Sequence, residues 1–254
     1  CFLDLGLTIP DETAIASIGP VTSEALVENG YEADLEAKSH DIPGLVAAGT
    51  GTCNSLINAG TLADCIGVAV AGDNIVVLPG THVAGGLTIP VSLTINGGGM
   101  GVSVIDAQSN DRHFVVDPGA GGSVIIKDVT LTNGNALAVG AFEDGGAVQA
   151  VTGALELVRT EIVNSSAYEG GAISCDGCDE LTVRESRLLS NTATTDGGAI
   201  LTDADATLVA NSTIQGNSAG DEGGGIYKAR DSITVRDSEV VENVSGDDGG
   251  GLYS

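Results

Sequence analysis

A pair of glycines returns five times in the second half of the chain at nearly constant spacing. The pairs start at Gly145, Gly170, Gly197, Gly223 and Gly249, so successive pairs are 25, 27, 26 and 26 residues apart. Each pair is followed by a small residue and then an aliphatic one, as in "GGAI" from Gly197. Self-similarity at such a fixed period is typical of solenoids, in which each repeat stacks on its neighbours.

A second marker with the same period lies between the glycine pairs. Segments such as "ELTVRESRLLSN" and "ATLVANSTIQGN" alternate apolar and polar residues and end on asparagine. Alternation with period two predicts strands, because an amphipathic helix would repeat every 3.6 residues. These strands are too short for long hairpins, so they predict a coil that returns to its start in each repeat. The terminal asparagines are Asn164, Asn191, Asn217 and Asn243.

The predicted fold class is therefore all-β, a right-handed single-stranded parallel β-helix with a short N-terminal capping helix. Composition agrees, since 42% of the residues are hydrophobic but only 3% are aromatic, and 38 are glycine. Glycine suits tight corners because it adopts positive φ without strain. Equivalent residues in stacked coils lie about 4.8 Å apart. The four asparagines are therefore expected to form a structural ladder of side-chain hydrogen bonds.

The repeats also divide the chain. Residues 1–52 contain no repeat and are interpreted as an anchor or linker. Residues 53–254 are assigned to the β-helix, with a cap at about 61–71 and coils from about 74 to 254. The cap would cover the open end of the solenoid, where strand edges and apolar core are otherwise exposed. The sequence stops within a repeat at "GGGLYS", so further coils or a partner are expected beyond Ser254.

Two parts of the sequence resemble known families. "GGAI", "SNTA", "GNSA" and "GGGIY" resemble the repeats of bacterial and archaeal surface β-helices, including the polymorphic outer membrane proteins. "TLADCIGVAVAGDNIVVLPGTHV" (61–83) is similar to the N-terminal cap of CSLREA-type β-helix proteins. In place of the Phe-x-x-Asn motif of the polymorphic proteins, this chain has "LLSN" and "VVEN". The resemblance implies a non-catalytic surface or secreted protein with a structural, adhesive or scaffolding role.

Cysteine spacing indicates an exported protein. Of five cysteines, Cys53 and Cys65 are close in sequence, as are Cys175 and Cys178, and both pairs are predicted disulfides. Disulfides imply an oxidising compartment, and a single Cys-x-x-Cys makes a poor zinc site. Cys1 is interpreted either as the lipid-bearing first residue of a mature lipoprotein or as the start of a trimmed chain. The expected location is extracellular, at the cell surface or anchored to an outer membrane.

Charge limits the partners. With 35 Asp and Glu against 9 Lys and Arg, the net charge is −26, which argues against nucleic acid. Membrane contact is expected only through a lipid on Cys1, because basic patches for anionic lipid are lacking. The partner is therefore an unidentified protein or glycan, and the chain could equally be a subunit of a larger envelope assembly.

An acid directly precedes each glycine pair. Stacking would place these acids in one column, which is either a solvated acidic edge or a site for Ca²⁺, since Ca²⁺ binds several oxygen ligands. Apart from Ca²⁺, no cofactor is indicated. The members of this acidic column are Asp144, Glu169, Asp196, Glu222 and Asp248.

The rival class is a polysaccharide lyase or hydrolase on a β-helix. Such enzymes need paired carboxylates, or a base beside metal-held carboxylates. "DAQSNDRHF" offers Asp106, Asp111, Arg112 and His113, although the same residues can form a loop between coils, and no catalytic residue is assigned. Three Asn-x-Ser/Thr triplets, which start at Asn164, Asn211 and Asn243, leave N-glycosylation open.

Overall fold

The computed structural model describes residues 16–17, 35–36, 52–55, 59–141, 143–230 and 232–254, with side chains from Leu62 onwards. The chain divides into two compact units, Cys1–Asn54 and Ser55–Ser254. In the first unit, β1 (Ala16–Ser17) and β2 (Leu35–Glu36) pair in parallel. The next strand, β3 (Thr52–Ser55), spans the boundary between the units and is the first strand of the eight-stranded sheet 1. Most of the predicted anchor segment, including Cys1 and its expected lipid, lies outside the described residues.

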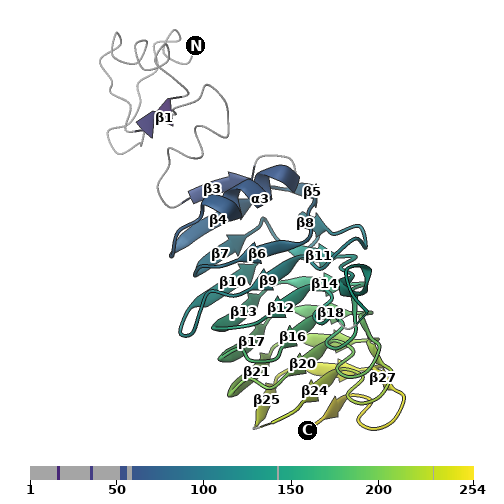
Figure 1. Cartoon of the computed structure of the whole chain (residues 1–254). Coiled ribbons are helices and arrows are strands. Elements are labelled where there is room, and N and C mark those ends of the chain that lie inside the picture. The colour runs from purple at the N-terminus through teal and green to yellow at the C-terminus, as the bar shows by residue number, and fades with distance from the viewer. Residues whose placement is uncertain (1–15, 18–34, 37–51, 56–58, 142, 231) are drawn as a thin grey trace, which may run out of the picture. The chain divides into compact units, whose positions relative to one another are not determined.

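The second unit is a parallel β-helix (Figure 1). Each coil adds one strand to each of three stacked sheets, and equivalent strands pair in parallel from coil to coil. Sheet 1 runs through β4 (Asp73–Val77), β7 (Leu93–Asn96), β10 (Ser123–Lys127), β13 (Ala154–Val158), β17 (Glu180–Arg184), β21 (Ala206–Ala210) and β25 (Ile233–Arg236).

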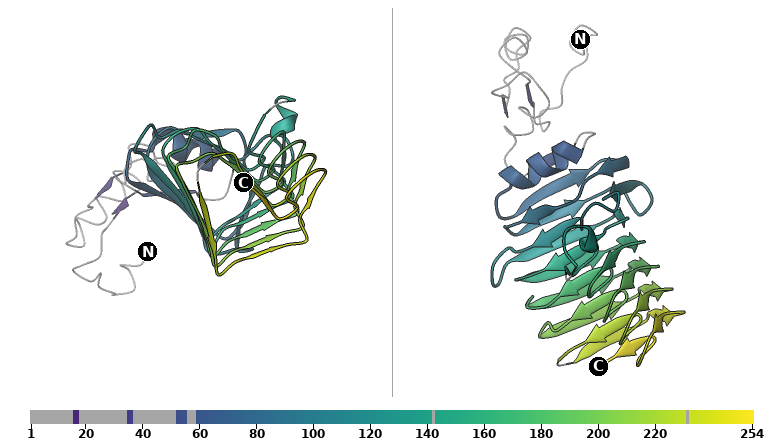
Figure 2. Two further views of the ribbon diagram at one scale, coloured as in Figure 1. Left: turned by 90° about the horizontal axis from the view of Figure 1, so that it is seen from below. Right: turned by 45° about the vertical axis from the view of Figure 1, so that its right-hand side comes forward.

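The remaining sheets complete each coil, as the view along the stack in Figure 2 shows. A 3₁₀ turn, η2 (Ala136–Ala138), lies in the long loop before β12. Sheet 2 contains β5 (Gly80–Val83), β8 (Ser103–Asp106), β11 (Thr130–Thr132), β14 (Glu161–Val163), β18 (Arg187–Leu189), β22 (Thr213–Gln215) and β26 (Glu239–Val241). Sheet 3 contains β6 (Leu87–Ile89), β9 (Phe114–Val116), β12 (Val148–Ala150), β16 (Ile173–Cys175), β20 (Ile200–Thr202), β24 (Ile226–Lys228) and β28 (Leu252–Tyr253). Sheet 4 contains the two-residue strands β15 (Ser166–Ala167), β19 (Thr192–Ala193), β23 (Ser218–Ala219) and β27 (Val244–Ser245).

The cap helix is α3 (Ala59–Val68), close to the 61–71 expected from the sequence. It packs against β4 and β6, the strands that the first coil adds to sheets 1 and 3. Leu62, Cys65 and Ile66 are buried, so one face of the helix covers the apolar interior of the first coil. The sequence therefore predicted both the β-helix and its N-terminal cap correctly.

Inward-facing residues stack in columns along the solenoid. In sheet 1, Ile126, Leu157, Val183 and Val209 are partners in successive strands, and all four are fully buried. Burying an aliphatic side chain of this size stabilises a fold by roughly 1.5–3 kcal/mol. Since every coil repeats this column in register, the strict alternation in the sequence becomes a continuous core.

Three asparagines form the predicted ladder inside the corner between sheets 2 and 4. Asn191 and Asn217 are 0% and 1% exposed. The Asn217 Oδ1 accepts from the backbone N–H of Asn191 at 2.9 Å and from its Nδ2 at 3.0 Å. The Asn243 Oδ1 accepts from Asn217 in the same way, at 2.9 Å in both cases. Each amide thus binds one coil to the next and satisfies backbone groups that water cannot reach.

Asn164 is not part of this ladder, and the sequence-based assignment was wrong there. The register pairs Val163 with Leu189 and Ser166 with Thr192, which puts Ser165, not Asn164, in line with Asn191. Accordingly, the backbone N–H of Ser165 donates to the Asn191 Oδ1 at 2.9 Å. Asn164 lies one residue earlier, exposed, with φ of 56°. The 27-residue spacing from Asn164 to Asn191, against 26 for the others, reflects this shift.

A disulfide joins Cys175 and Cys178 in the turn between β16 and β17, the pair expected from the sequence. Both cysteines are buried, and Gly177 between them has φ of 100°. Cys65 in α3 is also disulfide-bonded. Its predicted partner is Cys53, whose side chain lies outside the described residues.

Replacing Cys175 and Cys178 together by serine is expected to destabilise the β-helix by about 2 kcal/mol, the loop-entropy value for so short a ring. Urea denaturation of the variant and of the parent protein measures this difference. Reductant also opens the Cys65 disulfide, so the parent protein and the variant should become equally stable when reductant is added to both. A variant as stable as the oxidised parent would show that the disulfide leaves the unfolded chain unconstrained.

Candidate functional site

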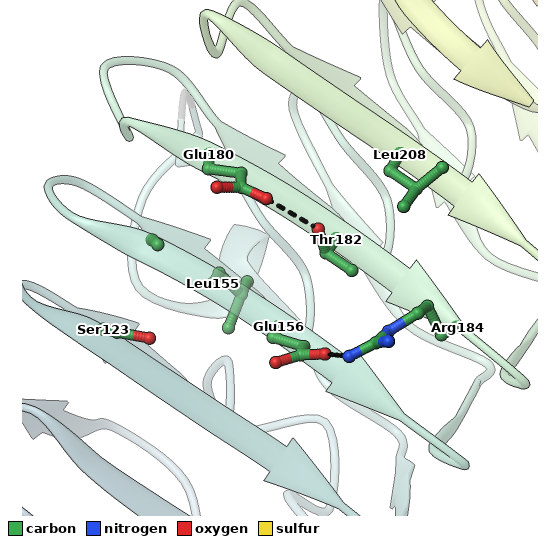
Figure 3. A pocket seen from close by; sticks show the side chains of 8 residues that line it. Ser123, Leu155, Glu156, Glu180, Thr182, Arg184 and Leu208 are labelled. Atoms are coloured by element: carbon green, nitrogen blue, oxygen red, sulfur yellow. Dashed lines mark hydrogen bonds and ion pairs between the residues drawn. The ribbon is translucent and has the colours of Figure 1, made fainter.

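The outer face of sheet 1 carries a hollow of about 320 Å³ (Figure 3). Outward-facing residues on neighbouring strands are in register here, since Glu156 pairs with Thr182 and Thr182 with Leu208. The lining residues are Ser123, Ala154, Leu155, Glu156, Glu180, Thr182, Arg184 and Leu208.

Polar groups converge on this hollow from β13 and β17. Arg184 forms an ion pair with Glu156 across the two strands, and the Thr182 hydroxyl donates to the Glu180 carboxylate at 3.1 Å (Figure 3). Glu180 is exposed, so its second carboxylate oxygen faces solvent. The hollow thus offers one free carboxylate and one neutralised pair beside the apolar Leu208, an arrangement suited to a small polar or cationic group.

Basic side chains gather along the corner between sheets 1 and 2, where they join successive coils. Arg159 contacts Asp128 of the preceding coil through two hydrogen bonds of 2.7 and 2.8 Å. This contact lowers the pKa of Asp128. Arg187 reaches Glu161 of the preceding coil at 3.3 Å. These basic residues therefore neutralise acids of the preceding coil at this corner.

The acidic column predicted from the sequence lies in register on the loops before sheet 3. The N–H of Gly170 donates to the Asp196 carbonyl, that of Gly197 to Glu222 and that of Gly223 to Asp248, each at 2.9–3.0 Å. All five glycines that start the pairs have positive φ, between 60° and 68°. The glycine turns thus hold one acid per coil above the next.

Side chains within the column contact each other's backbone as well. The Asp196 Oδ1 accepts from the Glu222 N–H at 2.9 Å, and the Asp144 Oδ1 from the Glu169 N–H at 3.2 Å. Burial, followed by the charges of Asp144 and Asp196, raises the pKa of Glu169. Burial likewise raises the pKa of Asp144. The pKa values of the two carboxyl groups at the N-terminal end of the column are therefore both raised.

Two tyrosines stack beside the C-terminal end of this column. The Tyr227 and Tyr253 rings, on the outer face of sheet 3, are 5.4 Å apart and 3° from parallel. Burial and the nearby carboxylates of Asp196 and Glu222 raise the pKa of Tyr227. The sequence analysis did not find this stack or the hollow, although both follow the same 26-residue spacing.

Among the described residues, no group of three or more His, Cys, Asp or Glu side chains has a geometry that could hold a metal ion. The Ca²⁺ site in the acidic column stays a prediction. Like charges about 5 Å apart in water repel by about 0.8 kcal/mol per pair, and salt screens them. We expect NaCl to raise the melting temperature.

Melts in NaCl and CaCl₂ at matched ionic strength separate the two interpretations of the column. A solvated edge predicts equal gains in both salts, whereas a Ca²⁺ site predicts an extra, saturable gain at low CaCl₂. No gain in either salt would mean that repulsion within the column does not limit stability.

Two of the residues considered for catalysis, Arg112 and His113, are buried, whereas Asp106 and Asp111 are half-buried. His113 is fully buried, and its Nε2 lies 3.1 Å from both the Ile105 and Thr132 carbonyls. Burial lowers its pKa to about 4. Arg112, also buried, is held by Gln149 and by Glu143, the latter at 2.5 Å. These contacts are those of side chains that fix a loop between coils.

His113 makes the fold sensitive to acid. Its pKa is about 4 in the folded protein and 6.5 when unfolded, so only the unfolded chain gains a proton between these values. Stability should therefore be complete above pH 6.5 and fall by about 3 kcal/mol as the pH drops to about 4. Urea midpoints from pH 7.5 to 4 measure the slope. His113→Gln should flatten it; an unchanged slope in that variant would assign the effect elsewhere.

Comparison with known families gives one match. Residues 211–228 match the Chlamydia polymorphic membrane protein repeat. No curated protein matches the chain. The matched segment contains β22, Asn217 of the ladder, β23 and the glycine turn before β24. The β-helix coil is therefore similar to a polymorphic membrane protein repeat. Ile214 lies three residues before Asn217, where the Phe-x-x-Asn motif of the polymorphic proteins has phenylalanine. The similarity of 61–83 to CSLREA-type caps stays a prediction.

None of the described helices has the length and apolar character needed to cross a bilayer.

Proposed function

We propose that this chain is a surface-exposed, non-catalytic β-helix module that acts as an adhesive or structural element of a cell envelope. The observation that carries the proposal is the family match, because it covers one structural unit of the coil, from the corner at Asn211 to Lys228 in β24. The same unit recurs in register around Asn191 and Asn243. The repeat therefore forms the body of this β-helix.

The fold is suited to presenting a surface. A stack of coils with a continuous core is rigid, and its outer faces can vary without disturbing the ladder or the glycine turns. The disulfide between Cys175 and Cys178 supports an oxidising, exported setting. The hollow on the outer face of sheet 1 is a place where a protein or glycan partner could bind.

Labelling of intact cells tests the location. A membrane-impermeant, amine-reactive biotin reagent applied to intact source cells should label the chain, and protease added outside should remove it. A cytoplasmic protein of known abundance serves as the control for lysis. Recovery of an unlabelled chain with reduced Cys175 and Cys178 from the cytoplasm would overturn the proposal.

The second candidate is an enzyme that acts on polysaccharides. It is favoured by two carboxylates, Glu156 and Glu180, at the rim of one hollow, since paired carboxylates carry glycoside hydrolysis. Incubation with a panel of acidic and neutral polysaccharides, followed by assays for reducing ends and for unsaturated products, distinguishes the two. We expect no turnover. Turnover that disappears in Glu180→Gln would replace the proposal by the enzyme.

A further inference from the structure

The three Asn-x-Ser/Thr triplets occupy different environments in the β-helix. We propose that Asn211 and Asn164 are attachment sites for N-linked saccharides and that Asn243 is not one. The triplets are Asn211-Ser212-Thr213, Asn164-Ser165-Ser166 and Asn243-Val244-Ser245. Modification requires an accessible amide and a hydroxyl two residues later, so the folded structure separates the three.

Asn211 meets both requirements. It is exposed at the corner between β21 and β22, with φ of 50°. Among the described residues, its side-chain amide makes no hydrogen bond, whereas its backbone N–H donates to the Arg236 carbonyl at 3.2 Å. Charged residues occupy the equivalent corner positions of neighbouring coils, as Glu185 and Asp237 show, so this edge accepts large solvated groups.

Asn164 meets them less fully. It is exposed at the corner between β14 and β15 with φ of 56°. The hydroxyl of its triplet, Ser166 Oγ, donates to the Asn135 Oδ1 at 3.1 Å. That hydrogen bond must open before the hydroxyl can be recognised. We therefore expect lower occupancy at Asn164 than at Asn211.

Asn243 fails because its amide is already used. Its Nδ2 donates to the Ile214 carbonyl at 2.9 Å, and its Oδ1 accepts two hydrogen bonds from Asn217. A saccharide on this nitrogen would displace the ladder at the corner between sheets 2 and 4. In the folded protein the Asn243 triplet is therefore inaccessible to the transferase.

The proposed reaction is a group transfer without a redox change. The donor is a saccharide linked to a lipid through pyrophosphate. The bond between the anomeric carbon and the pyrophosphate oxygen breaks, and a bond from that carbon to Nδ2 of the asparagine forms. The lipid pyrophosphate leaves with the electron pair, and one Nδ2 proton passes to a base of the transferase. The attached saccharides would border the outer face of sheet 2, because Asn211 and Asn164 lie at its two corners.

An in-vitro transfer reaction tests the assignment. The folded, unglycosylated chain is incubated with a purified single-subunit oligosaccharyltransferase and a lipid-pyrophosphate-linked oligosaccharide, and occupancy is read by peptide mass spectrometry. Occupancy should decrease from Asn211 to Asn164. At Asn243 it should be at least about tenfold lower than at Asn211, the factor that corresponds to about 1.4 kcal/mol for breaking its hydrogen bonds.

Two controls make the result decisive. Peptides from the unfolded chain should be modified at Asn243 as well as at Asn211, which shows that folding, not sequence, closes Asn243. Thr213→Val should abolish transfer to Asn211 and leave Asn164 unchanged. Failure of the folded protein to accept saccharide at Asn211, or equal occupancy at Asn211 and Asn243, would overturn the proposal, and so would peptides that accept none.

Discussion

Asn217→Ala is expected to destabilise the β-helix by about 4 kcal/mol. The Asn217 side chain satisfies the buried Asn191 N–H and the Leu188 carbonyl, at 2.9 and 3.0 Å. Alanine leaves the buried Asn191 N–H without a partner, which costs about 1–3 kcal/mol, and removes the side-chain donor to the Leu188 carbonyl. The vacated volume adds to the loss because neighbouring coils cannot collapse into it. Urea denaturation followed by far-UV circular dichroism measures the change.

Asn164→Gly is the matched control. Asn164 is exposed. Ser190 occupies the equivalent corner in the next coil and Gly216 in the coil after that, so this corner already accommodates glycine. We expect a change within about 0.5 kcal/mol, as for other surface substitutions. Equal losses in Asn217→Ala and Asn164→Gly would falsify the assignment of the ladder to Asn191, Asn217 and Asn243.

The solenoid could be predicted from the sequence because its determinants are local and periodic. Each glycine pair and each alternating strand repeats after about one coil, so a period near 26 residues fixes which strands stack. The acidic column followed directly, since each acid precedes its glycine pair. The cap helix was placed within a few residues because it has to end before the first strand.

The position of Asn164 could not be read from the type of residue. Asparagine suits both the buried ladder and an exposed corner with positive φ, and only the register distinguishes them. The extra residue between Asn164 and Asn191 was the available signal. When a repeat motif is matched with a spacing that varies by one residue, it can therefore assign an exposed corner residue to the buried ladder.

The hollow on sheet 1 was missed for a different reason. It is formed by outward residues from different coils, and the repeat has no fixed residue type at these positions, where Glu156, Thr182 and Leu208 follow one another. The separation of 26 residues between Glu156 and Thr182 places them side by side, and the hollow is also lined by Ala154 and Ser123 from the neighbouring column. The surface shape of a solenoid depends on side chains from several neighbouring columns and coils. Comparing the repeats one at a time therefore does not reveal such a hollow.

Gly198→Ala should cost about 3 kcal/mol or more, the upper part of the range for overpacking. A Cβ at Gly198 would lie 2.1 Å from the Gly224 carbonyl oxygen and 2.7 Å from the Ser218 backbone nitrogen. Both are backbone atoms of the next coil, which cannot rotate away as a side chain could. The coils would have to separate, which would weaken the hydrogen bonds of the glycine turn. The urea midpoint and the melting temperature measure the loss.

Gly216→Ser separates this clash from the general cost of removing a glycine. Gly216 has φ of 66°, but a Cβ there would meet only the Ser190 Oγ at 3.8 Å. Ser190 itself occupies the equivalent corner one coil earlier with φ of 54°. Serine should therefore lower the free energy of unfolding by no more than about 1–2 kcal/mol, which is the cost of a left-handed backbone conformation without a steric clash. If Gly198→Ala is no worse than Gly216→Ser, the coils are not in contact at the glycine pairs, and the second glycine of each pair is needed for some reason other than close approach.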